Sequence, residues 1–315
     1  MSGVRPVLPS RPMTRDGARW AGDLQASGFR GALQPDEPLA PLTTWRLGGP
    51  AELLATPASV DDVACAVRYA EATGVPWRIL GNGSNLLIRD HGVPGIVLRL
   101  RRALDGVEVD GETVRVGAGA LFPAVAHVAV QASLAGIEFG AGIPGTLGGA
   151  IVMNAGWHEF EIGNVVESVT WIDERAEVHV DGRAACAFGY RRSAFRGARR
   201  VVLETMLALR GEDPERIRER LEAYAARRKE TQPTHLPSCG SVFLKPPGDF
   251  AGRLIEAAGL KGLRIGGVEV SRKHANFFVH VGGGTAADAL ALVERVEDEV
   301  ATRFGVRLER EFELW

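Results

Sequence analysis

Two glycine-rich stretches constrain this chain more than any other part of its sequence. Residues 81–86 read Gly-Asn-Gly-Ser-Asn-Leu, residues 142–150 read Gly-Ile-Pro-Gly-Thr-Leu-Gly-Gly-Ala, and apolar segments flank both. Glycine permits positive φ angles and lets a ligand approach the main chain closely. Successive exposed backbone N–H groups then form an anion-binding concavity. Two such loops predict a binding site for a large ligand that contains a pyrophosphate.

Other interpretations of these loops are weaker. Residues 140–145 formally match the dinucleotide-binding pattern G-x-G-x-x-G, but Pro144 lies inside the loop and a second glycine pair follows at 148–149. That motif should instead end a strand and open a helix. The first loop is not a P-loop, because no Gly-Lys-Ser/Thr follows Gly83. Tight turns in a protein with 39 glycines among 315 residues remain possible, although two loops of this length disfavour them.

The composition is that of a globular protein, with 45% hydrophobic and 24% charged residues. A net charge of −2 argues against nucleic acid as a partner. No apolar run approaches the roughly 20 residues that span a bilayer, so we expect no membrane insertion and a cytoplasmic location. Cys65, Cys186 and Cys239 lack metal-ligand spacing, and an odd count argues against a disulfide framework. We therefore expect no metal.

The hydrophobic pattern alternates between strands and helices. Ser59 can cap a helix that ends at Gly74, and a strand at 77–80 leads into the first glycine loop. We expect further strands at 51–56, 97–100, 107–109, 114–116, 169–172, 177–180, 201–209 and 306–312, and further helices at 122–134, 215–229 and 286–304. This order is typical of an α+β protein and not of a regular βαβ repeat.

Four further segments extend the pattern of the two loops. They are residues 44–51 (Thr-Trp-Arg-Leu-Gly-Gly-Pro-Ala), 153–156 (Met-Asn-Ala-Gly), 190–195 (Tyr-Arg-Arg-Ser-Ala-Phe) and 237–243 (Pro-Ser-Cys-Gly-Ser-Val-Phe). In this order they resemble the motifs of the UDP-N-acetylenolpyruvoylglucosamine reductases, also called UDP-N-acetylmuramate dehydrogenases. The resemblance runs from about residue 40 to the C-terminus and is highly specific when the motifs are taken together.

The resemblance implies an α+β fold: the two-subdomain FAD-binding fold of the vanillyl-alcohol oxidase type, followed by a C-terminal α+β substrate domain. We expect residues 39–210 to form the FAD-binding domain and residues 211–315 the substrate-binding domain. Residues 1–38 are rich in Pro, Arg and Gly, and we expect a mobile extension there, part of which could dock through Trp20, Leu24 and Phe29.

The resemblance also implies a reaction. The family reduces UDP-N-acetylglucosamine-enolpyruvate to UDP-N-acetylmuramate for peptidoglycan precursor synthesis, with NADPH as reductant and FAD as the hydride carrier. Enolate character then develops beside a carboxylate, so the site needs cations or donors there and a proton donor at the other carbon. Ser241 matches the family's proton donor and Arg191 its carboxylate-binding arginine. Taken alone, Ser241 would be a turn residue beside Gly240, and Arg191 would be a surface arginine.

Glu311 matches the C-terminal catalytic glutamate of the family. Strand alternation would place Glu309, Glu311 and Glu313 on one face, so only the motif selects Glu311. The family usually follows this glutamate with Val-Arg, whereas this chain has Phe312-Glu313.

Further site residues follow from the matched motifs. The glycine loops and the asparagine after them imply a cofactor site that consists of Gly81, Asn82, Gly83, Ser84, Asn85, Leu86, Gly142, Ile143, Pro144, Gly145, Thr146, Gly148, Gly149, Ala150 and Asn154. The FAD should be non-covalent, because neither loop carries a histidine. The implied substrate-binding residues are Tyr190, Arg228, Lys245 and His274, although Arg228 could equally complement a helix C-terminus.

Relatives that carry an inserted tyrosine-bearing loop have it after residue 195, and this chain resembles the shorter subtype without that loop. Another way of covering the substrate diphosphate is then implied. Two alternatives to the reductase remain: an FAD-dependent oxidase of the same fold, and a non-enzymatic flavin- or nucleotide-binding module. We expect a monomer that binds a UDP-linked amino-sugar enolpyruvate.

Overall fold

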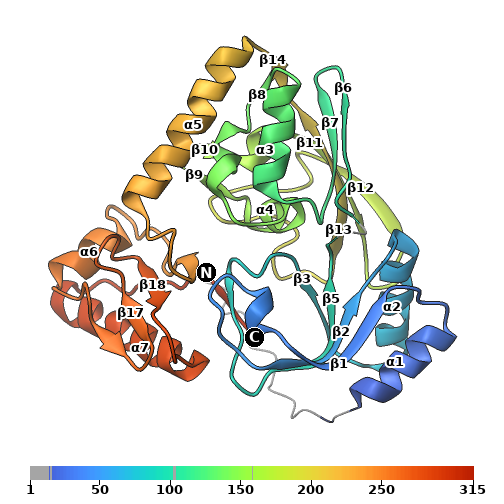
Figure 1. The fold of residues 1–315 in the computed structure, drawn as a ribbon, viewed down its shortest axis with the longest axis horizontal. Helices are drawn as coiled ribbons and strands as arrows, with labels where there is room; N and C mark the ends of the chain where they lie inside the picture. The colour runs from blue at the N-terminus through green and yellow to red at the C-terminus, as the bar shows by residue number, and fades with distance from the viewer. Residues whose placement is uncertain (1–13, 15, 102–103, 158) are drawn as a thin grey trace.

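The computed structural model describes residue 14 and residues 16–101, 104–157 and 159–315. The molecule has three parts, each built on its own sheet, and the C-terminal end of the chain returns to the middle of the molecule between them (Figure 1). No helix among the described residues is long and apolar enough to cross a membrane.

The first part is a mixed sheet in the order β1-β2-β5-β3, in which β1 is antiparallel to β2 and the other pairs are parallel. Its elements are α1 (Gly17–Ala26), β1 (Ala32–Pro38), β2 (Pro50–Thr56), α2 (Val60–Thr73), β3 (Trp77–Leu80) and β5 (Val93–Arg99). The Ser59 side chain accepts a hydrogen bond from the N–H of Asp62, and Gly74 ends α2 at φ 68°. The predicted caps of this helix are therefore confirmed.

The expectation of a mobile extension over residues 1–38 is wrong for Gly17–Pro38. Helix α1 carries Trp20 and Leu24, which with Phe29 are at most 3% exposed and belong to the same core as α2. Strand β1 pairs with β2 along its whole length. Burying three large apolar side chains stabilises the folded chain by about 1.5–3 kcal/mol each. This stabilisation orders the segment although it is rich in Pro, Arg and Gly. Residues 1–13 and 15 lie outside the described part of the chain.

The second part is an antiparallel sheet in the order β12-β11-β13-β7-β6, with α3 and α4 against one face (Figure 1). Its elements are β6 (Val107–Asp110), β7 (Thr113–Gly117), α3 (Phe122–Gln131), the 3-10 helix η2 (Glu138–Gly142), α4 (Leu147–Met153), β11 (Val166–Ile172), β12 (Val178–Gly182) and β13 (Val201–Ala208). Two short antiparallel pairs accompany it, β8 (Leu134–Ala135) with β14 (Arg210–Gly211) and β9 (Gly156–Trp157) with β10 (Phe160–Glu161). The second glycine loop leads from η2 into α4, and Thr146 caps that helix.

The third part is an antiparallel sheet in the order β15-β18-β17-β16 with its own apolar core. Its elements are β15 (Ser238–Ser241), α6 (Ala251–Ala257), β16 (Arg264–Ile265), β17 (Val268–Val270), β18 (Phe277–His280) and α7 (Ala286–Phe304). A capping box of Thr285 and Asp288 begins α7. The carboxylate of Asp90 accepts hydrogen bonds from the first two N–H groups of α7 at 2.8 and 2.9 Å and so joins this part to the first.

Helix α5 (Pro214–Thr231) runs from the second part toward the third (Figure 1). It is strongly charged, and its buried residues are Ile217 and Leu221. It packs on α3 and on η2, so the helix that we assigned to the substrate domain lies against the second glycine loop.

The predicted strand at 306–312 is wrong. The chain forms β19 (Glu313–Leu314) instead, which pairs in parallel with β4 (Leu86–Leu87) directly after the first glycine loop. The register of this last segment is set by a partner more than 200 residues away in the sequence, which local alternation does not reveal.

Candidate active site

The two glycine loops lie against each other, as expected. The Asn82 side-chain amide donates to the carbonyl oxygen of Pro144 at 2.9 Å. A Cβ atom on Gly81 would lie 2.5 Å from the Thr146 hydroxyl oxygen, so this contact requires glycine. The first loop follows β3, an edge strand of the first sheet, whereas the second lies between η2 and α4 of the second part.

The first loop offers free main-chain donors. Within the described residues, the backbone N–H groups of Asn82, Gly83 and Ser84 donate to no protein acceptor, and Gly83 has φ 61°. The Gly83 carbonyl accepts from the Thr44 N–H at 3.1 Å, which fixes the loop from behind. Consecutive free N–H groups around a left-handed residue form a nest for an anion, and a pyrophosphate fits this donor set.

The second loop uses more of its donors internally. The N–H of Gly148 donates to Ala118 at 2.9 Å, and that of Gly149 donates to the Thr146 hydroxyl at 3.3 Å. Of the other predicted cofactor residues, Ala150 is buried in the adjoining core and Leu86 lies in β4. The structure thus brings the predicted loop residues together, and the first loop has the more open face.

Asn154 has a structural position rather than a ligand-facing one. Its side chain is buried, donates to Glu161 at 2.7 Å and to the Gly189 carbonyl at 3.0 Å, and accepts from the Gly163 N–H at 2.9 Å. These bonds use both amide hydrogens, so the Asn154 side chain has no N–H donor left for the cofactor. Instead it anchors the turn that precedes Tyr190.

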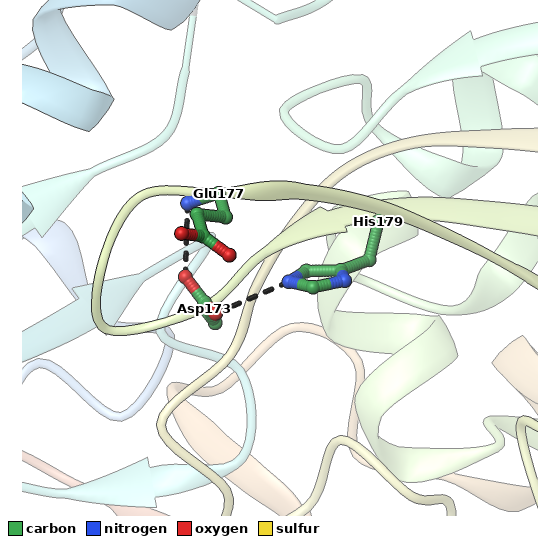
Figure 2. Close-up of side chains that lie close together, drawn as sticks. All are labelled: Asp173, Glu177 and His179. Atoms are coloured by element: carbon green, nitrogen blue, oxygen red, sulfur yellow. Dashed lines mark hydrogen bonds and ion pairs between the residues drawn. The ribbon is translucent and has the colours of Figure 1, made fainter.

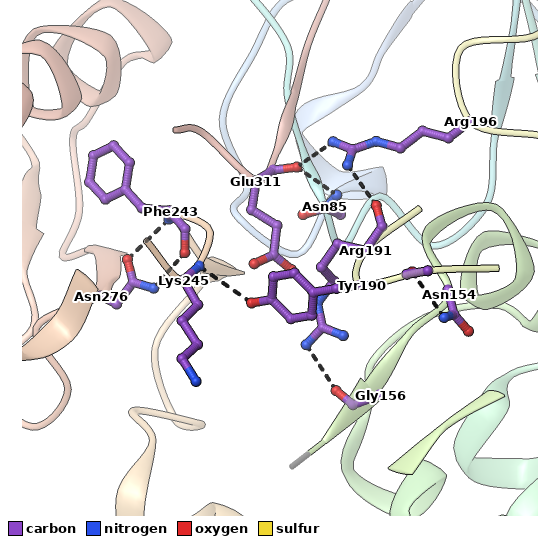
Figure 3. Close-up of polar contacts among 11 residues, drawn as sticks. Asn85, Asn154, Gly156, Tyr190, Arg191, Arg196, Phe243, Lys245, Asn276 and Glu311 are labelled. Carbon is purple, nitrogen blue, oxygen red and sulfur yellow. Dashed lines mark hydrogen bonds and ion pairs between the residues drawn. The ribbon is translucent and has the colours of Figure 1, made fainter. Parts of the chain in front are cut away.

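Arg191 and Glu311 form an ion pair across the middle of the molecule (Figure 3). The Arg191 Nε donates to Glu311 Oε1 at 2.8 Å, and its Nη2 donates to the Gly156 carbonyl at 3.0 Å. Arg191 adopts φ 51°, an unfavourable region for a residue with a side chain. Burial raises the pKa of Glu311, and the positive charge of Arg191 opposes that increase. Bonds to the described residues use two of the five guanidinium N–H donors, and the others can bind a ligand.

The first glycine loop also contacts this pair. The Asn85 side chain donates to the Glu311 carbonyl at 3.3 Å, and the Glu313 N–H donates to the Asn85 carbonyl at 2.9 Å. The loop that offers free N–H groups is therefore joined directly to the segment that carries the glutamate.

Ser241 ends β15 after Gly240, which has φ 83°. The Glu311 N–H donates to the carbonyl of the next residue, Val242, at 2.8 Å, and the Thr44 hydroxyl ties Ser238 of the same strand to the first loop at 2.7 Å. The half-buried Ser241 hydroxyl has no hydrogen-bond partner in the described ranges. It therefore has a donor and an acceptor left for a ligand.

Tyr190 and Lys245 lie at the exposed side of this pair (Figure 3). The Tyr190 ring is 54% exposed and lies under the Arg191 guanidinium, 5.2 Å from the ring centroid. Its hydroxyl accepts from the Lys245 N–H at 3.4 Å. The Lys245 ammonium lies over the exposed ring of Phe250, 4.4 Å from its centroid. Sequence reasoning missed Phe250, because nothing in its local pattern separates it from a core residue.

Arg228 lies on the second glycine loop. A Cβ atom on Gly142 would lie 2.5 Å from its Cδ, so the arginine stem packs directly on that glycine. Burial lowers the pKa of Arg228 to about 10. Among the described residues no carboxylate forms an ion pair with it. A partly buried cation without a protein counter-ion suits an anionic ligand.

His274 is less closely connected to the site. Burial lowers its pKa, and its Nδ1 accepts from the Asn276 N–H at 3.3 Å. Asn276 in turn forms two hydrogen bonds with the main chain of Phe243, so it secures the segment after Ser241 (Figure 3). The contacts of His274 itself do not reach Arg191.

Three potential metal ligands gather in the turn between β11 and β12. Single ligand atoms of Asp173, Glu177 and His179 lie within 4.8 Å of one another (Figure 2). The turn accounts for this arrangement, because one Asp173 oxygen accepts two backbone N–H groups at 2.9 Å and the other lies 3.1 Å from His179 Nε2. We assign no metal to these residues.

The paired α+β subdomains and the free main-chain donors of the first loop define a flavin-binding oxidoreductase fold of the vanillyl-alcohol oxidase type. Residues 51–181 match the model of an FAD binding domain, and residues 232–315 match the model of the UDP-N-acetylenolpyruvoylglucosamine reductase C-terminal domain. The chain belongs to the UDP-N-acetylenolpyruvoylglucosamine reductase family and is an FAD-dependent oxidoreductase.

Its relatives match almost its full length. The enzyme of that name from Rubrobacter xylanophilus is 47% identical over 89% of this chain and 94% of its own. That from Moorella thermoacetica is 45% identical over 94% of this chain and 97% of its own. The crystal structure of UDP-N-acetylenolpyruvylglucosamine reductase from Thermus caldophilus superposes with a TM-score of 0.78 at 36% identity and covers 91% of this chain and 99% of that one. The expected fold class is confirmed.

We expect Gly83→Val to weaken FAD binding by at least about tenfold, equivalent to roughly 1.4 kcal/mol. A Cβ atom there would lie 2.7 Å from the Leu42 carbonyl oxygen and from Thr43 Cα, so the loop must move and its N–H groups must turn away from the pyrophosphate. The measurement is the FAD content of the purified protein and its affinity after reconstitution.

Gly111→Val is the matched control. Gly111 has φ 57° in the β6–β7 turn, and no atom lies within 4 Å of its added Cβ. The Gly111→Val variant therefore has a similarly unfavourable positive φ angle but no steric clash, and it should retain FAD. Equal FAD content in the two variants would show that the first loop does not hold the cofactor.

Proposed function

We propose that this protein reduces UDP-N-acetylglucosamine-enolpyruvate to UDP-N-acetylmuramate with NADPH, in peptidoglycan precursor synthesis. The observation that carries the proposal is the meeting of three groups at one place. The Arg191–Glu311 pair, the strand end that carries Ser241 and the first glycine loop come from four separate segments of the chain, and hydrogen bonds join these segments.

The chain's own groups account for binding and protonation. The unused N–H donors of Arg191 bind the carboxylate of the enolpyruvyl group and stabilise the negative charge that develops beside it. FAD, when bound and reduced by NADPH, would supply the hydride for the terminal alkene carbon. The Ser241 hydroxyl then gives its proton to the neighbouring carbon and recovers a proton from water. Glu311 holds Arg191 in place through their ion pair.

The remaining cations suit the nucleotide part of the substrate. Arg228, on the second glycine loop, and Lys245, beside Tyr190, present positive charge that no ion pair in the described part of the chain neutralises. We propose that they bind the diphosphate and so replace the tyrosine-bearing loop that this subtype lacks. His274 is proposed as a more distant substrate residue.

An FAD-dependent oxidase of the same fold is the alternative. It would need no proton donor beside an arginine–glutamate pair, which is why the reductase is favoured. We also propose a cytoplasmic location and a monomer, since Arg191, Ser241 and Glu311 of one chain would suffice for the proposed reaction.

Anaerobic titration of the FAD-loaded protein tests the proposal. NADPH should bleach the flavin absorbance, and UDP-N-acetylglucosamine-enolpyruvate should then restore it without oxygen. An oxidase would recover its absorbance with oxygen but not with this substrate. A protein that only binds flavin would not be bleached by NADPH at a catalytic rate.

A further inference from the structure

The side chain of Arg196 lies between the two segments that carry the ion pair. Only 10% of it is exposed. Its Nη1 donates to the carbonyl oxygen of Arg191 at 2.8 Å, and its Nη2 donates to the carbonyl oxygen of Glu311 at 3.1 Å (Figure 3). One planar guanidinium therefore holds the main chain on both sides of the Arg191–Glu311 pair.

Both carbonyl groups need such support. Arg191 has φ 51°, a conformation that costs of order 1–3 kcal/mol and persists only where neighbouring groups enforce it. Glu311 lies in a segment without regular secondary structure, just before β19, where its carbonyl accepts from Arg196 and from Asn85. Side chains that bind ligands through a fixed geometry depend on this kind of support.

Glu313 provides the counter-charge for Arg196. Its Oε1 lies 3.2 Å from the Arg196 Nε, so the third nitrogen of the guanidinium also has a hydrogen-bond partner. Glu313 belongs to the Phe312-Glu313 sequence, which departs from the usual family pattern. The negative charge of Glu313 also opposes the effect of burial on Arg78, whose pKa burial lowers. The departure therefore supplies a partner for a buried cation.

We propose that Arg196 is a positioning residue that sets the geometry of Arg191 and Glu311 through their carbonyl groups, with Glu313 as its counter-ion. This inference rests on the proposed function, because the geometry matters only if the pair acts on the enolpyruvyl substrate. It assigns the two carbonyl contacts, and not the Arg196–Glu313 ion pair, as the essential interactions.

The test compares variants in the two half-reactions by anaerobic stopped-flow absorbance of the FAD-loaded protein. Arg196→Met should be reduced by NADPH within about twofold of the parent rate, whereas its reoxidation by UDP-N-acetylglucosamine-enolpyruvate should slow about 10- to 100-fold, as expected for a small misplacement of reacting groups. Arg196→Lys should be intermediate, because an ammonium cannot reproduce the planar fork. Glu313→Gln should reoxidise within about threefold of the parent, because both carbonyl contacts remain.

Arg310→Met is the matched control. Arg310 is also partly buried and donates to Glu297 with two nitrogens at 2.6 and 2.7 Å, with Glu294 3.9 Å away, and both glutamates lie on α7. It should lose thermal stability without selective loss of reoxidation. In a crystal structure of Arg196→Met, the Arg191 φ angle should leave the positive region or the Arg191–Glu311 distance should exceed 4 Å.

Several results would overturn the inference. One is parent-like reoxidation of Arg196→Met, and a second is an equal loss in both half-reactions. A third is a Glu313→Gln variant as slow as Arg196→Met, since the ion pair would then be the essential contact. If Arg196→Met does not fold, Arg196→Lys replaces it in the test. Parent-like reoxidation of Arg196→Lys, together with an Arg191 φ angle outside the positive region, would then overturn the inference. A parent protein that the substrate does not reoxidise refutes the proposed function itself, whereas an active parent with a fully active variant refutes only the positioning role.

Discussion

Ser241→Ala is expected to take up FAD normally, to bleach with NADPH at a near-parent rate, and then to hold the reduced state when the enolpyruvyl substrate is added. Reduction of the flavin requires no proton from Ser241, whereas reoxidation requires protonation of the substrate carbon. Loss of a positioned general acid slows its step about a hundred- to ten-thousand-fold. The measurement is anaerobic stopped-flow absorbance of each half-reaction.

Two serine variants sharpen this test. Ser241→Cys should recover part of the reoxidation rate, because a thiol can also deliver a proton. Ser238→Ala alters the other serine of β15, which bonds Thr44 through its backbone only, and should behave like the parent. If Ser241→Ala reoxidises as fast as the parent, Ser241 is a turn residue beside Gly240 and the proton comes from another group.

Arg191→Ala is expected to lower kcat/KM about a hundred- to a thousand-fold, the usual loss when a donor to developing negative charge is removed. Turnover and affinity should both fall, because the arginine is proposed to bind the carboxylate before and during the reaction. Arg191→Lys should recover only part of the loss, since a point charge does not replace the fork. Steady-state kinetics of the purified variants provide the measurement.

Arg191 and Glu311 should also be energetically coupled. Without Arg191 the buried Glu311 loses the charge that opposes its raised pKa, so the carboxyl group is more easily protonated. Glu311→Gln combined with Arg191→Ala should therefore cost less than the sum of the single losses. Arg192→Ala, at an exposed neighbouring position, serves as the control and should retain parent kinetics. If Arg191→Ala changes KM but not kcat, the arginine only binds the substrate and does not stabilise the transition state further.

Local sequence signals predicted the elements whose causes are local. Ser59 and Gly74 bound α2 because capping and the left-handed conformation depend on residues within one turn. The helix expected at 286–304 has those bounds, because Thr285, Asp288 and Gly305 are adjacent to it in the sequence. The strand expected at 306–312 failed because β19 pairs with β4, and that partner is distant in the sequence.

The candidate site shows the same division. The glycine loops and the matched motifs named Arg191, Ser241 and Glu311, because those residue types recur at fixed positions in the motifs. The motifs did not reveal that the Asn154 side chain is buried and hydrogen-bonded to the main chain of Gly163 and Gly189. That role depends on which main-chain groups surround the side chain in three dimensions.

The sequence by itself determined the two glycine loops, the α+β character, the approximate bounds of α2, α3, α5 and α7, and the family of the protein. The tertiary structure alone decided that α1 and β1 belong to the core, that α5 presents Arg228 to the second glycine loop, and that Arg196 bridges Arg191 and Glu311. The physical reason is the range of the interactions. Caps, turns and periodicity act within a few residues, whereas burial and the pairing of distant charges depend on segments that only folding brings together.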